Sequence, residues 1–94
     1  TPMQTEELEK RLKELQAELE ALAAKAEAKG EKARADFEVR KERLRRKIKD
    51  AREKLQKARK SGGTAIKDIS AGVKAAIRDI EAACKDAESR FKEE

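Results

Sequence analysis

The side chains best able to do chemistry in this chain are cations. Residues 40–60 hold 12 basic and three acidic residues, a local excess of +9 in a chain whose net charge is +5. Arginine and lysine contact phosphate oxygens, so a basic run of this kind is typical of nucleic-acid binding. The candidate polyanion contacts are Arg43, Arg45, Arg46, Lys49, Arg52 and Arg59.

The same basic run also has a purely structural interpretation. On a helix its cations project all round the axis, and no aromatic residue stands among them to stack on bases. A solvated helix face, partly paired with acids of a neighbouring helix, is therefore the leading interpretation. Binding of nucleic acid or another polyanion through residues 40–60 is kept as the alternative, and we expect no membrane contact.

Other reactive groups are few. The chain has no His, Trp or Tyr and a single Cys, so the usual nucleophile–base pairs and metal ligands are missing. Acids four residues apart, such as Glu14 and Glu18, resemble helical carboxylate metal sites, but interspersed lysines make surface ion pairs the better reading. Gly62-Gly63 lacks the lysine and hydroxyl residue of a phosphate loop. We expect no enzymatic activity, cofactor, metal or small-molecule substrate.

Cys84 occupies an apolar position of a predicted helix, which predicts a small buried residue and not a reactive thiol. One cysteine cannot form an internal disulfide, and this suits a reducing compartment. No apolar run reaches the roughly 18 residues of a membrane span, and no signal segment opens the chain. The sequence therefore predicts a cytoplasmic protein.

The elements that must position these residues are helical. Ala, Glu, Lys, Leu and Arg make up 64 of 94 residues, well above the roughly 50% that already indicates a coiled coil. Apolar residues follow heptad spacing from Leu8 to Ala26 and again from Leu44 to Ala58, with eleven-residue steps through Phe37 between them. We expect an all-α fold, with residues 1–94 forming a single domain.

Gly30 and Gly62-Gly63 are the two places where a helix can end. Gly30 has good helix formers on both sides, and connections between helices usually take 2–8 residues. We therefore predict an unbroken helix over 5–60, a turn over 61–64 and a second helix over 64–93. Residues 1–4 are expected to be an N-terminal tail, in which Thr1 and Pro2 precede the natural start as a cloning remnant. The alternative is a monomeric three-helix bundle that turns at Gly30.

The short Gly-Gly turn predicts that the two helices form an antiparallel hairpin. Its register pairs Arg40 with Asp86 and Lys47 with Asp79. Each surface pair contributes only about 0–1 kcal/mol, so these pairs select the register more than they stabilise it. The second helix is too short to cover the leucines of residues 8–26, and an uncovered apolar stripe of that length indicates a partner.

We therefore expect a homo-oligomer, either a dimer or a dimer of dimers, that forms a helical bundle. In it, the acidic N-terminal arm of a partner would cover the side of Arg45, Arg52 and Arg59. The protein would be a structural, protein-binding coiled coil that self-associates through its apolar seam. The predicted seam and core residues are Leu8, Leu12, Leu15, Leu19, Leu22, Phe37, Leu44, Ile48, Leu55, Ile66, Ile69, Val73, Ile77, Ile80, Cys84 and Phe91.

Residues 63–80 read GTAIKDISAGVKAAIRDI, and residues 89–91 read SRF. Together with the TEEL of residues 5–8 and the ARADF of residues 33–37, these segments resemble small bacterial coiled-coil proteins assigned to stress responses, common in cyanobacteria and proteobacteria. That family opens with a Glu/Leu/Ala/Lys heptad helix and ends with an Arg-Phe. Ile66 and Ile77 stand where it usually has Trp. The resemblance implies a cytoplasmic helical protein linked to stress, without an established activity.

Overall fold

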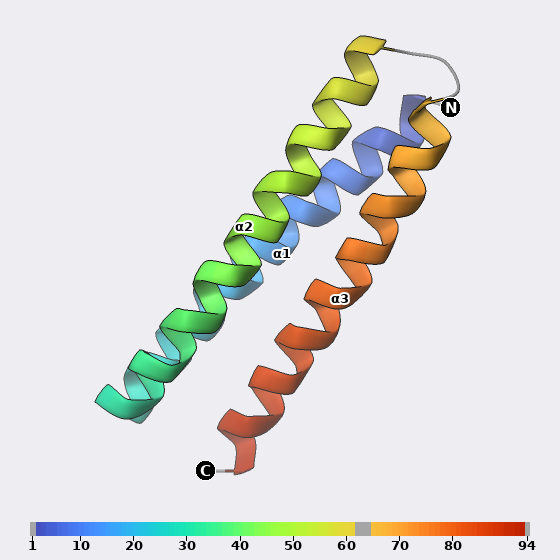
Figure 1. The fold of residues 1–94 in the computed structure, drawn as a ribbon. Coiled ribbons are helices and arrows are strands. Elements are labelled where there is room, and N and C mark those ends of the chain that lie inside the picture. The colour runs from blue at the N-terminus through green and yellow to red at the C-terminus, as the bar shows by residue number, and fades with distance from the viewer. Residues whose placement is uncertain (1, 62–64, 94) are drawn as a thin grey trace.

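The computed structural model describes the backbone of residues 2–61 and 65–93, and the side chains of residues 5–60 and 67–92. It contains three helices, α1 (Pro2–Lys29), α2 (Glu31–Ser61) and α3 (Ala65–Glu93), and no strand within the described ranges. The helices pack pairwise into an elongated bundle that measures 48 × 18 × 15 Å (Figure 1). The prediction of an all-α fold is confirmed.

The chain turns at Gly30, so the prediction of an unbroken helix over 5–60 is wrong. Gly30 has a φ of +129°, a conformation that L side chains rarely adopt and that takes the chain out of the helix. Its N–H donates to the carbonyl of Glu27 at 3.2 Å, and its own carbonyl accepts from the N–H of Arg34 at 3.0 Å. One residue therefore closes α1 and opens α2. The alternative with a turn at Gly30 has the right helix order.

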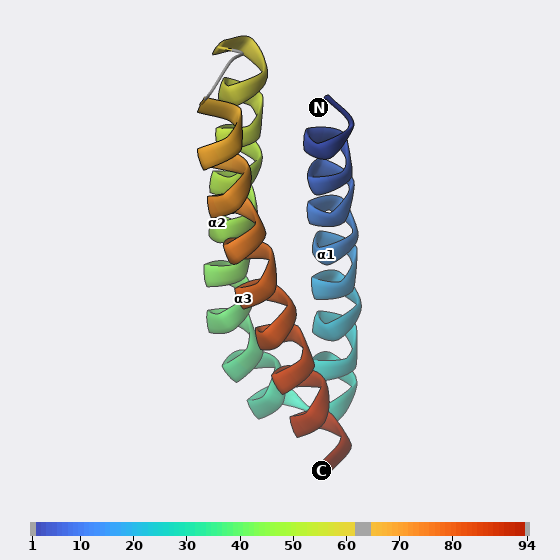
Figure 2. The same cartoon turned by 90° about the vertical axis from the view of Figure 1, so that its right-hand side faces the viewer.

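The helices alternate in direction and run down, up and down in Figure 1 and Figure 2. Figure 2 shows α1 and α2 antiparallel, with α3 returning beside them and crossing obliquely from the α2 side towards the α1 side. Residues 2–4, predicted to be a tail, already belong to α1. Ser61 is the last residue of α2, and the other residues of the predicted turn, 62–64, lie outside the described residues.

The core runs along the bundle axis because all three helices carry apolar residues three and four positions apart. Leu12, Leu15 and Leu19 of α1 have no exposed surface. Nearly all predicted seam residues are buried; Ile69 and Phe91 are partly buried, and the side chain of Ile66 lies outside the described residues. The core also includes Ala26, Ala51, Ala58 and Ala87.

The leucine stripe of α1 is covered by the same chain. Its five leucines belong to one core cluster with residues of α2 and α3, and each is at most 9% exposed. A partner was expected because a two-helix hairpin leaves this stripe uncovered. The turn at Gly30 brings α2 back along it, so that argument for self-association no longer holds.

Candidate polyanion-binding surface

The basic run of residues 40–60 lies entirely on α2, whose packing orients it. Leu44, Ile48, Ala51, Leu55 and Ala58 are buried against the other helices, so the residues between them face outward. Among the six candidate polyanion contacts, five are exposed and Arg52 is partly buried; the exposed five are Arg43, Arg45, Arg46, Lys49 and Arg59.

Acids of the same chain pair with some cations of the run. Arg40 approaches Asp86 of α3 at 3.5 Å, which confirms that predicted pair. Lys41 approaches Glu20 of α1 at 3.3 Å. Acidic residues of α1 thus face α2 within one chain, where the sequence predicted that a partner's arm would do so.

Arg59 is the only one of the six candidate contacts with an ion pair among the described residues. It approaches Glu9 at 3.1 Å and Glu6 at 3.9 Å, both on α1. Lys47 and Asp79 line one groove between α2 and α3, as the predicted register requires, but their charged atoms do not approach within 4 Å. The helix face is thus partly paired, as expected, and within the described part of α2 the other five candidate contacts have no ion pair.

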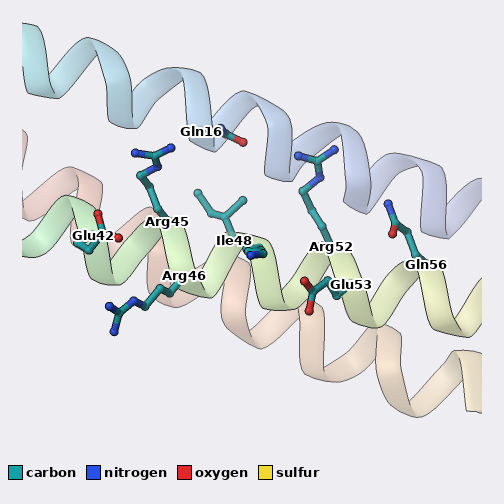
Figure 3. Close-up of a pocket in the computed structure, with 9 residues that line it drawn as sticks. Gln16, Glu42, Arg45, Arg46, Ile48, Arg52, Glu53 and Gln56 are labelled. Atoms are coloured by element: carbon teal, nitrogen blue, oxygen red, sulfur yellow. The ribbon is translucent and has the colours of Figure 1, made fainter.

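A groove between α1 and α2 gathers several of these cations. Its volume is about 560 Å³. In the close-up, Arg45 and Arg52 turn towards α1, the side chain of Gln16 lies between them, and Arg46 turns away (Figure 3). The residues that line the groove are Gln16, Glu42, Arg45, Arg46, Ile48, Lys49, Arg52, Glu53 and Gln56.

Some polar groups of the groove have no partner among the described residues. The Nε of Arg52 is buried without a hydrogen-bond partner among the described residues. Leaving a buried donor unpaired costs about 1–3 kcal/mol, and more for a charged group. Glu42 and Glu53 also line the groove, yet neither forms an ion pair with its arginines. The described lining thus combines four cations, two acids and one unsatisfied buried N–H.

The other reactive residues lie between α1 and α3. Arg11 donates to a carboxylate oxygen of Glu81 at 2.7 Å and approaches Glu18 at 3.5 Å. The hydrogen bond to Glu81 is the main reason that the pKa of Arg11 is raised. Cys84 lines a cavity beside this cluster and is 6% exposed. Within residues 5–60 and 67–92, no three acidic or cysteine side chains gather as a metal site requires.

Sequence reasoning identified the cations but missed the groove and its Gln16. A polar residue beside the leucine seam gives no sign of which helix it will face. Only the antiparallel packing of α1 on α2 brings Gln16 to Arg45 and Arg52. In an unbroken helix over 5–60, Gln16 and these arginines lie far apart along one axis. The turn at Gly30 brings them together.

Comparison with protein-family models, curated proteins and solved structures finds no match to this chain. The resemblance to stress-response coiled-coil proteins stays a prediction. None of the described helices is both long and apolar enough to cross a membrane.

Proposed function

We propose that this chain is a non-enzymatic helical protein that binds nucleic acid or another phosphate-bearing polyanion through α2. The observation that carries the proposal is the row of cations without acidic partners among the described residues. Among the six candidate contacts, those without an ion pair are Arg43, Arg45, Arg46, Lys49 and Arg52. Because most of their guanidinium and ammonium groups are exposed, a polyanion needs no unfolding or domain opening to reach them.

The absence of aromatic residues from residues 40–60 defines the kind of binding. Without stacking side chains, contacts go to the phosphate backbone and carry little base preference. Each neutralised phosphate releases condensed counterions, so affinity falls steeply with salt. Five phosphate contacts correspond to a slope of about −4 in a plot of log K against log salt concentration.

The test is fluorescence anisotropy with labelled single-stranded and duplex oligonucleotides, in salt from about 50 mM to about 200 mM. We expect binding to both, with little dependence on base sequence and a slope of about −4. Absence of binding at the lowest salt concentration, or a slope near zero, contradicts the proposal.

The matched control for this experiment is the double variant Arg40→Gln/Lys41→Gln. It removes two charges from the same helix, but both of these cations have acidic partners on α1 or α3. We expect it to change the slope less than Arg43→Gln/Arg46→Gln, which removes two cations without partners among the described residues. Equal effects of the two variants indicate that net charge alone decides the affinity.

A further inference from the structure

Three cations of the α1–α2 groove are spaced to meet one elongated anion. Arg45, Lys49 and Arg52 follow each other at four and three residues, so they lie on one side of α2. The rise of an α-helix separates Arg45 from Arg52 by about 10 Å along the axis. Both guanidinium groups turn to the side on which Gln16 reaches down from α1 (Figure 3).

The cations repel one another, and the two acids of the lining, Glu42 and Glu53, balance only part of their charge. None of the three has an ion pair among the described residues. The guanidinium of Arg52 also retains a buried N–H without a partner in the described part of the chain. One anion between the arginines removes the repulsion and supplies the missing acceptor at the same time. Guanidinium groups bind phosphoryl oxygens in a planar, bidentate arrangement, which makes phosphate a better occupant than a monatomic anion.

The volume and the lining of the groove favour a ligand with several linked phosphoryl groups. A volume of about 560 Å³ lies within the range of small-ligand sites and is larger than one phosphate requires. Ile48 is the only apolar side chain in the lining, and no aromatic residue is present to hold a nucleobase. The lining can therefore recognise the phosphates of a ligand, and has little with which to recognise a base.

We propose that the groove between α1 and α2 is a discrete site for an oligophosphate. Arg45, Lys49 and Arg52 bind the phosphoryl oxygens, and the side-chain amide of Gln16 donates a hydrogen bond from α1. The inference rests on the proposed function where the oligophosphate is a stretch of nucleic-acid backbone. It extends that function, because the same site takes a free polyphosphate or the phosphates of a nucleoside triphosphate.

The chain contains a natural control for this site on the opposite flank of α2. Lys47 and Lys54 are also seven residues apart and line the groove between α2 and α3. Asp50 and Asp79 share that lining, so its charge is already balanced. Two grooves of one helix thus present cation pairs of equal spacing but different net charge.

The experiment is isothermal titration of the full chain with inorganic tripolyphosphate. We expect the wild type to bind it and Arg45→Gln/Arg52→Gln to weaken binding about tenfold or more, the effect of losing charge-assisted hydrogen bonds. The control Lys47→Gln/Lys54→Gln removes the same net charge and is expected to weaken binding less than about threefold. Equal losses in the two double variants, or no binding by the wild type, overturn the site.

Gln16→Ala tests the part of the site that net charge does not explain. This variant leaves the charge unchanged, and alanine favours the helix of α1. We expect tripolyphosphate to bind at least about tenfold more weakly, because one hydrogen bond to a charged group is lost. Unchanged affinity would mean that α1 contributes nothing to binding, and this result overturns the groove proposal. Circular dichroism of each variant shows whether the helices are intact.

Competition against bound tripolyphosphate distinguishes the sources of the phosphate chain. Displacement by an oligonucleotide assigns the groove to the proposed nucleic-acid function. Displacement by long-chain polyphosphate or adenosine triphosphate, without oligonucleotide binding, supports the groove while the proposed function fails in its nucleic-acid form. Oligonucleotide binding that both double variants weaken equally supports the proposed function, and the groove proposal fails.

Discussion

Cys84 shows how its surroundings control a single reactive group. The thiol is buried between α1 and α3, and this burial is the main cause that raises its pKa. The carboxylates of Glu18, Glu81 and Glu88 act in the same direction, while Arg11 opposes them. The thiol is therefore neutral at pH 7 and is a poor nucleophile. This agrees with the prediction that Cys84 is a small buried residue.

The raised pKa of Cys84 predicts a pH dependence of stability. In the unfolded chain the thiol ionises near pH 8.5, while in the folded chain it ionises only at higher pH. Folding stability linked to this group is therefore complete below about pH 8.5 and decreases above it. We expect the free energy of unfolding of the wild type to fall more between pH 7 and pH 9.5 than that of Cys84→Ala, measured by urea titration. Parallel pH profiles of the two proteins contradict this prediction.

Residue types alone revealed the core and the cations, but not which cations are free. Heptad spacing marked the buried leucines, because burial on a helix follows a fixed period. The antiparallel register identified the acidic partner of Arg40, but it could not show the surroundings of Arg45, because the place of α1 beside α2 follows from the turn at Gly30. Arg40 meets Asp86 on α3, whereas Arg45 reaches the groove beside Gln16.

At the scale of the elements, the decisive feature is a connection of one residue. The flanking lysines and glutamates favour helix, and the sequence contains no loop-forming cluster around Gly30. A connection this short works because the positive φ of Gly30 reverses the chain while both of its backbone hydrogen bonds are retained. Loop-forming residues do not mark this turn. Apart from Gly30 itself, the only sequence signal near it is the change of heptad spacing between Ala26 and Phe37.

Substitution of Gly30 and Gly72 by alanine distinguishes the effect of backbone conformation on stability from the effect of a steric clash. A Cβ at Gly30 or at Gly72 would meet no atom within 4 Å, so neither substitution produces a clash. Gly30→Ala places alanine at positive φ, and we expect it to lower the free energy of unfolding by about 1–2 kcal/mol. Gly72→Ala, within α3, should raise it by about 0.5–1 kcal/mol. Urea denaturation measures both; a stabilising Gly30→Ala means that the chain does not turn there.

At the scale of the molecule, three antiparallel helices produce a rod. The radius of gyration is 15.1 Å, whereas a globular chain of 94 residues has one of about 12 Å. Charge is divided between the helices: acids of α1 meet cations of α2. Arg45, Lys49 and Arg52 gather without ion pairs on the α1 side of α2. The net charge of +5 therefore reflects a local excess and not an evenly basic surface.

Solution scattering can distinguish the three-helix bundle from the predicted long hairpin. The bundle requires a radius of gyration near 15.1 Å and a particle mass of 10.6 kDa. A helix over 5–60 would by itself be about 84 Å long, and an oligomer of such hairpins would be heavier. We expect the smaller values at micromolar concentration, because the leucines of α1 are covered within the chain. A larger mass restores the case for self-association.

The odd number of helices has a further consequence for anything attached to this chain. Because the three helices alternate in direction, the start of α1 and the end of α3 lie at opposite ends of a body 48 Å long (Figure 1). A two-helix hairpin would bring its termini together. The bundle separates groups attached at its two ends by about its own length of 48 Å, and the cations of α2 lie between them.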